Sequence, residues 1–133
     1  MHSTNKWVAL LDEDQDDFVI FQQGMNNWAP ELELRWYTSF AHFEQMLQTN
    51  ADLPASIVLN GISPSGSEID WIRQFKLTPR LAEIPVIILA EEYWEQQKQQ
   101  FKTVSIYDYR TKPVNQAELK QFVELIKDSS RHA

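Results

Sequence analysis

The sequence predicts one α/β domain, a three-layer sandwich in which a parallel sheet is covered by helices on both faces. Two observations support this. Five short, β-rich apolar runs alternate along the chain with longer amphipathic segments, and turn signals separate them. The connections are short, and 133 residues suit one domain with one core. We therefore expect a single domain over residues 1–133, with a core of about 6–127 and short flexible tails.

The first part of the chain predicts two strands and two helices. Residues 6–11 are apolar on both faces, as expected for a strand that helices cover on each side. A helix follows over about 16–27, and Pro30 ends it. Residues 33–37 alternate with one wetter side, which indicates an edge strand. Ser39 then caps a second amphipathic helix.

The middle of the chain predicts two buried strands. Residues 55–59 are a short apolar run, typical of a central strand, and the composition of 60–66 indicates a loop. A third helix follows and ends before Pro79. Residues 84–90 form the most β-branched run in the chain, so we expect a buried strand there.

The last part predicts a helix, a strand and a final helix. Residues 91–102 are rich in glutamine and helical in pattern, and 104–107 form the fifth expected strand. Asn115 opens a capping-box-like helix start, and that helix should run through Lys127. Residues 128–133 should fray.

The composition excludes several classes of function. The chain carries 19 acidic and 12 basic residues, so it lacks the basic excess that nucleic-acid binding requires. It has no cysteine, which excludes disulfide frameworks, thiol catalysis and Cys-ligated metal centres. Its apolar runs are much shorter than the ~20 residues of a membrane span. Its first residues carry no secretory signal. We expect a cytoplasmic protein that binds neither nucleic acid nor membranes.

The carboxyl ends of four expected strands carry the candidate site. Functional groups of doubly wound sheets lie at this edge, because the loops that follow the strands meet there. The residues at these ends are Asp12-Glu13-Asp14, Asn60, Ala90 and Thr111-Lys112-Pro113.

This arrangement resembles the receiver domain of two-component response regulators (CheY-like), and the resemblance covers essentially the whole chain. It implies a flavodoxin-like (βα)5 fold with strand order 2-1-3-4-5. In that family an Asp at the position of Asn60 accepts a phosphoryl group from a histidine kinase. Acidic residues at the positions of Asp12 and Glu13 bind the assisting Mg²⁺. A Thr or Ser at the position of Ala90, and the lysine that matches Lys112, contact the phosphoryl group.

The chain departs from the family at the positions that carry this chemistry. Asn60 has no anionic oxygen to attack phosphorus, Ala90 has no hydroxyl, and Glu13 is one methylene longer than Asp. Glu68 replaces the glycine usual after the loop, and Ser105 stands where a glycine normally ends the fourth helix. We therefore expect a stand-alone pseudo-receiver, not an enzyme, that acts in two-component signal transduction by protein–protein interaction without phosphorylation.

The acidic segment after the first strand has two interpretations. A helix N-terminus is enriched in acid because the helix macrodipole favours it, and we prefer this interpretation for Asp14, Asp16 and Asp17. Asp12 and Glu13 are the candidate ligands of a divalent ion. Because Asn60 removes one anionic ligand, we expect weak Mg²⁺ binding at most and no required cofactor. A divalent-ion or small-ligand sensor that uses this acidic pocket is the alternative function.

Lys112 also has two interpretations. It either awaits an anion or forms a structural ion pair with Asp12 and Glu13 in the absence of a metal. We favour the ion pair, because Asn60 cannot be phosphorylated.

The candidate partner-binding residues are Trp94, Gln97 and Tyr109, around the fourth helix and fifth strand. In the family this is the commonest partner-binding face, and Tyr109 matches an aromatic residue that changes rotamer on activation. Without a phosphoryl group we expect one fixed conformation of this face. The glutamine run 96–100 should be a solvated helix face, and Tyr107 should pack inward. The expected partner is a histidine kinase or a downstream signalling protein, and a homodimer stays open.

Overall fold

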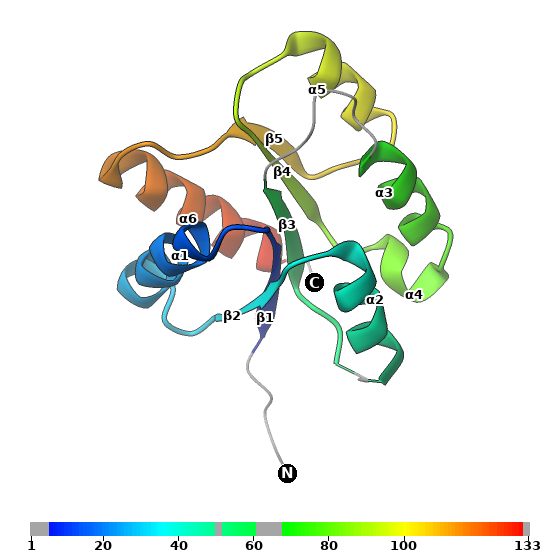
Figure 1. Cartoon of the computed structure of the whole chain (residues 1–133), viewed down its shortest axis with the longest axis horizontal. Helices are drawn as coiled ribbons and strands as arrows, with labels where there is room; N and C mark the ends of the chain where they lie inside the picture. The colour runs from blue at the N-terminus through cyan, green and yellow to red at the C-terminus, as the bar shows by residue number, and fades with distance from the viewer. Residues whose placement is uncertain (1–5, 50–51, 61–67, 132–133) are drawn as a thin grey trace.

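A computed structural model describes residues 6–49, 52–60 and 68–131, and in it a five-stranded parallel sheet lies between two layers of helices (Figure 1). The strands are β1 (Trp7–Leu11), β2 (Glu33–Tyr37), β3 (Ser56–Asn60), β4 (Val86–Ala90) and β5 (Asp108–Thr111). Their order, β2-β1-β3-β4-β5, confirms the predicted flavodoxin-like topology. The predicted loop 60–66 lies outside the described residues apart from Asn60, which ends β3.

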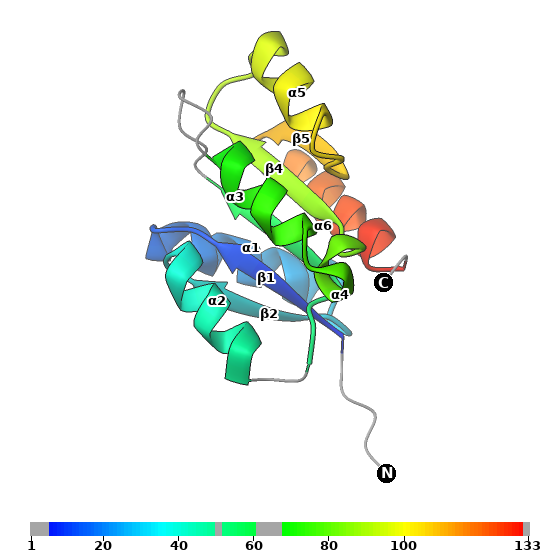
Figure 2. The ribbon, with the colours of Figure 1, turned by 90° about the vertical axis from the view of Figure 1, so that its right-hand side faces the viewer.

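Helices cover both faces of the sheet, as the two orthogonal views show (Figures 1 and 2). One face is covered by α1 (Gln15–Trp28) and α6 (Gln116–Ser130). The other carries α2 (Phe40–Thr49), α3 (Glu68–Lys76), the short α4 (Pro79–Ala82) and α5 (Glu95–Lys102). Among the described residues, no helix has the length and apolarity that a membrane crossing needs.

Two hydrophobic cores follow from the two-residue periodicity of the strands. In β1, Val8 and Leu10 contribute to the core under α1 and α6, whereas Ala9 and Leu11 contribute to the core on the opposite face. All five residues of β1 are buried. This confirms the expectation of a central strand that is apolar on both sides.

The predicted helix starts are confirmed where a side chain caps them. Asp14 accepts a hydrogen bond from the amide of Asp16 at the start of α1. The Ser39 hydroxyl accepts one from the amide of His42 at the start of α2. Asn115 accepts one from the amide of Glu118 at the start of α6. These bonds satisfy amide groups that have no partner inside the helix.

The prediction that residues 128–133 fray is wrong for residues 128–130. Helix α6 continues to Ser130, and both Ser129 and Ser130 are buried. The Lys6 ammonium group donates a hydrogen bond to the Ser130 carbonyl oxygen at 3.1 Å, which ties the helix end to the start of β1. Tertiary contacts therefore extend this helix beyond Lys127. The sequence did not indicate the extension, because serine residues add nothing to an apolar periodicity.

Between residues 79 and 111 the observed elements differ from the prediction in three places. The fifth strand is Asp108–Thr111 rather than 104–107. Helix α5 begins at Glu95 rather than 91, and residues 79–82 form the additional helix α4. Val104 and Ile106 belong to the turn after α5 and pack against the core from there, so their β-branched side chains indicated burial rather than strand pairing.

Ser105 has a strained backbone conformation in the turn between α5 and β5. Its φ is 58°, a left-handed conformation that favours glycine, and it lies in the turn that reverses the chain after α5. The departure noted in the sequence, a serine where a glycine normally ends this helix, therefore leaves strained backbone at this position.

Replacing Ser105 by glycine should stabilise the fold. A Cβ atom in this conformation costs about 1–2 kcal/mol, and the greater freedom of glycine in the unfolded chain offsets about half of that. We expect Ser105→Gly to raise the free energy of unfolding by about 0.5–1 kcal/mol in urea denaturation. Lys102→Gly, in the last turn of α5, is the control and should lower it. Equal effects of both variants would contradict the assignment of strain to Ser105.

Candidate functional site

The carboxyl ends of the strands surround a hollow of about 470 Å³. Its lining comes from the ends of β1 and β3, the start of α1, the loops after β2 and β4, the start of α3 and the residue after β5. Six of the lining residues are acidic: Asp12, Glu13, Asp14, Asp17, Glu68 and Glu91. The lining also includes Asn60 and Lys112. Of the predicted strand-end residues, Ala90, Thr111 and Pro113 do not line the hollow.

Asp12 is buried directly after β1, and both of its carboxylate oxygens accept hydrogen bonds. One oxygen accepts a hydrogen bond from the amide of Asp14 at 2.9 Å, and the other accepts one from the Asn60 side-chain amide at 2.6 Å. Burial raises the pKa of Asp12, the Asn60 hydrogen bond opposes that rise, and the nearby charge of Asp17 adds to it. The folded protein therefore holds this charge at a cost in free energy.

Asn60 connects two carboxylates from different elements. Its Nδ2 donates to Asp12 Oδ2 at 2.6 Å and lies 3.2 Å from Asp17 Oδ2. Its Oδ1 is buried and has no hydrogen-bond partner among the described residues. Asn60 is therefore a hydrogen-bond donor between two acidic side chains.

Lys112 closes this network from β5, and its partner corrects the prediction. Its Nζ lies 2.6 Å from Asp17 Oδ1 and not in an ion pair with Asp12 or Glu13. Burial alone would lower the pKa of Lys112, but the hydrogen bond and charge of Asp17 outweigh it, so the pKa is raised. The Lys112 amide also donates to the Ala90 carbonyl oxygen at 3.0 Å, which fixes the lysine beside the end of β4.

Asp17 is the functional residue that sequence reasoning missed. The helix macrodipole, which accounts for Asp14 and Asp16, does not account for Asp17, because this residue is 7% exposed and its carboxylate contacts Asn60 and Lys112. The position of Asp17 in the first turn of the helix could have indicated this role. Side chains in the first helical turn point back toward the helix N-terminus, here toward the end of β1. Asp14, the N-cap, does fit the helix-start interpretation.

Trp36 is a second contributor that the sequence did not reveal. Its indole nitrogen donates to the Asp12 carbonyl oxygen at 2.6 Å, and its ring stacks on Phe18 with centroids 5.3 Å apart. The side chain therefore holds the backbone after β1 in position.

The arrangement of acidic groups does not fit a Mg²⁺ site. Mg²⁺ requires nearly octahedral oxygen ligands. Here Asp12 accepts two N–H bonds, Asp17 is paired with Lys112, and Glu13 is exposed. Within the part of the chain that the structure describes, no three His, Cys, Asp or Glu residues are grouped to hold a metal ion. The candidate pair Asp12 and Glu13 is therefore not assembled as a ligand set.

Tyr109 and Gln97 are buried rather than on a surface, which corrects two of the three predicted partner-binding residues. Tyr109 is 3% exposed and Gln97 is 4% exposed. The Tyr109 hydroxyl donates to Gln97 Oε1 at 2.8 Å and lies 3.4 Å from the amide of Trp94. The glutamine run is therefore not a uniformly solvated face, because Gln97 points into the core. Trp94 is 36% exposed, and its neighbour Tyr93 is also exposed.

Two other predicted residues lie where the sequence indicated. Ala90 is buried at the end of β4 and presents no hydroxyl group to the hollow. Tyr107 is half-buried against the core under α6, and its hydroxyl donates to Asp128.

Comparison with known proteins gives a structural likeness only. No protein-family model matches the chain, and no curated protein matches it. Solved structures do match. The phosphorylated cyanobacterial phytochrome response regulator RcpA has a TM-score of 0.77 at 22% identity, covering 94% of this chain and 93% of that one. The Mn²⁺-bound form of response regulator Rcp1 has a TM-score of 0.75 at 22% identity, covering 92% of each chain.

A two-component response regulator from Legionella pneumophila has a TM-score of 0.78 at 17% identity, covering 95% of this chain and 98% of that one. These similarities establish that the chain has the fold of response regulator receiver domains.

Replacing Asn60 by aspartate should destabilise the folded protein at neutral pH. The change removes the donor shared by Asp12 and Asp17 and adds a third carboxylate, so we expect a loss of about 2 kcal/mol or more in the free energy of unfolding. The carboxyl pKa values in the variant should rise, so the loss should shrink as the pH falls toward 4. Denaturation between pH 4 and 8 measures this.

Asn115→Asp is the matched control for that experiment. It makes the same chemical change at an exposed N-cap, where Asp and Asn stabilise a helix about equally. A stability of Asn60→Asp equal to that of the control at pH 7 would contradict the donor role of Asn60.

Proposed function

We propose that this chain is a receiver-like module of two-component signal transduction that acts by protein contact and accepts no phosphoryl group. Asn60 carries this proposal. An amide nitrogen bonded to two carboxylates has no anionic oxygen with which to form an acyl phosphate. The response regulators RcpA and Rcp1, which share the fold, are described as phosphorylated and Mn²⁺-bound respectively. Neither state is supported by the side chains of this hollow.

The groups that would contact a phosphoryl oxygen support the same conclusion. Ala90 offers no hydroxyl group, and Lys112 is already paired with Asp17 at 2.6 Å. A lysine held by an internal carboxylate loses that ion pair if it turns to an incoming anion. Asp17 therefore already balances the charge of Lys112, and a phosphoryl group could bind the lysine only by breaking this ion pair.

A single conformation of the α5–β5 region is part of the proposal. A ligand shifts an equilibrium only through contacts that differ between two states, and the contacts of a phosphoryl group are missing here. The hydrogen bond from Tyr109 to buried Gln97 favours the inward position of the tyrosine ring without any ligand. The module is then a fixed adaptor whose output depends on its abundance.

The partner surface that this proposal requires is centred on Tyr93 and Trp94. Both side chains are exposed beside the hollow's edge of the sheet, at the start of α5. Exposed aromatic side chains are common at the centres of protein interfaces. A histidine kinase or a downstream signalling protein is the expected kind of partner.

The alternative function, a sensor of divalent ions or small ligands, has one specific observation in its favour. Within the described part of the chain, Asn60 Oδ1 is a buried acceptor without a partner, and it lies in an acidic hollow. Calorimetric titration of the wild-type chain with Mg²⁺, Mn²⁺ and Ca²⁺ separates the two functions, because a tight site would support the sensor and weak or absent binding the adaptor.

The wild-type chain should remain unmodified when it is incubated with acetyl phosphate and Mg²⁺. Intact-mass spectrometry measures this directly. Any stable gain of one phosphoryl mass on the wild-type protein would contradict the proposed function. A receiver domain that has the phosphoacceptor aspartate, treated in parallel, shows that the reagent is active.

Removing the Gln97 side chain should release Tyr109. In Gln97→Ala the buried hydroxyl loses its acceptor at 2.8 Å and keeps only the more distant Glu92 carbonyl oxygen at 3.4 Å, so the ring should exchange between positions on the microsecond-to-millisecond timescale. Relaxation-dispersion NMR should give flat profiles for residues 90–110 in the wild type and exchange in the variant. Gln96→Ala, at an exposed neighbouring position, should behave as the wild type. Exchange in the wild type would mean that a two-state switch survives.

A further inference from the structure

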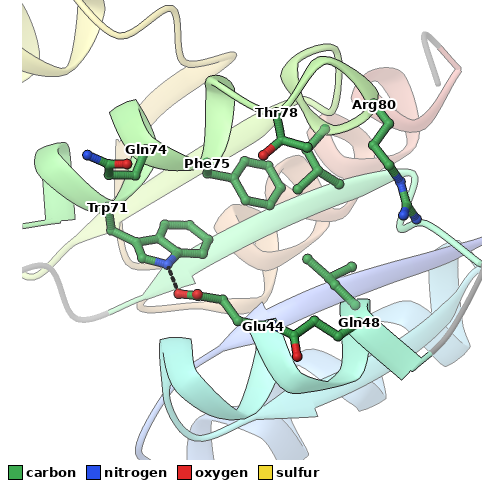
Figure 3. A pocket seen from close by; sticks show the side chains of 9 residues that line it. Glu44, Gln48, Trp71, Gln74, Phe75, Thr78 and Arg80 are labelled. Carbon is green, nitrogen blue, oxygen red and sulfur yellow. Dashed lines mark hydrogen bonds between the residues drawn. The ribbon is translucent and has the colours of Figure 1, made fainter.

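A second hollow lies on the face of the sheet that carries α2 and α3, away from the acidic site. It is a groove of about 400 Å³ between α2 on one side and α3 with α4 on the other (Figure 3). This volume lies in the range of small-molecule sites in proteins, about 300–1,000 Å³. None of its lining residues belongs to the acidic hollow.

The groove exists because aromatic side chains fill only part of the space between α2 and α3. Trp71 stacks on Phe40 at 4.3 Å and on Phe75 at 5.1 Å, measured between ring centroids. Beyond this stack, toward α4, the facing side chains are the smaller Leu47 and Leu81. Phe75, Leu47 and Leu81 therefore give the groove an apolar floor that the helices do not cover.

The two ends of the groove carry opposite charges. At one end the Glu44 carboxylate accepts a hydrogen bond from the Trp71 indole nitrogen at 2.7 Å, as Figure 3 shows. At the other end Arg80 extends from α4, and its guanidinium group forms no ion pair with any described residue. Thr78 adds a hydroxyl group on the same side of the groove as Arg80.

We propose that this groove binds a small carboxylic acid with one apolar, ring-containing body. The body would lie on Phe75, Leu47 and Leu81, and the carboxylate would pair with the guanidinium group of Arg80, whose planar donors match a carboxylate. The fixed carboxylate of Glu44 repels a second acidic group, so the ligand carries a single acid, directed toward Arg80. This binding site goes beyond the signalling function and does not depend on it.

Titration of the full chain with 2-naphthoate, followed by NMR, tests this proposal. The indole N–H signal of Trp71, identified by its absence in Trp71→Phe, should shift and saturate. Arg80→Gln should weaken naphthoate binding about five- to tenfold, the loss expected for one charged hydrogen-bonded pair near the surface. The neutral isostere 2-naphthamide should bind wild type and Arg80→Gln equally.

Arg73→Gln is the matched control, because Arg73 is an exposed arginine of α3 that does not line the groove. It should bind naphthoate as the wild type does. The proposal is overturned if the Trp71 signal does not saturate, or if Arg80→Gln and Arg73→Gln bind equally well. It is also overturned if sedimentation shows a dimer that Arg80→Gln dissociates, because the groove then belongs to an interface between two copies.

Discussion

The structure depends on one constraint, the placement of two carboxylates, Asp12 and Asp17, next to each other at the edge of a parallel sheet. Like charges in a partly buried site repel strongly, so groups between them must offset that repulsion. Asn60 does so by donating to both, and Lys112 does so by pairing with Asp17. Because the four residues come from β1, α1, β3 and the segment after β5, this chain of polar contacts crosses the sheet edge and fixes its loops.

The same network offsets the charge of the buried acids with groups of the protein itself. A receiver domain that binds a metal ion can leave its acidic groups open, because the cation offsets their charge. Here a protein amide and a protein ammonium group take that place. At the neighbouring edge, Gln97 accepts a hydrogen bond of 2.8 Å from the buried Tyr109 hydroxyl group. In both places a polar group of the protein itself satisfies a buried polar side chain.

The sequence was sufficient for the sheet and insufficient for part of the site. The resemblance to receiver domains predicted the strand order, and hydrophobic periodicity placed the first four strands within two residues, because burial on both faces of a parallel sheet leaves a strong pattern. It failed at 104–107, where Val104 and Ile106 pack against the core from either side of left-handed Ser105. It failed for Asp17 and Gln97 because a polar residue that is buried by its partners looks, in a sequence, like one that faces water.

The hydrogen bond between Lys6 and Ser130 holds both ends of the described chain on the same side of the protein, which determines how the protein is oriented when it is attached to a surface. Both ends of the described chain emerge at the amino-terminal edge of the sheet, where the Lys6 ammonium group meets the last turn of α6 and Ser56 lies beside Ser130. The acidic hollow and Trp94 lie at the opposite edge. A tag, a fluorophore or a sensor-chip linker at either end therefore leaves that edge facing outward, so immobilised protein presents the acidic hollow and Trp94 to solution.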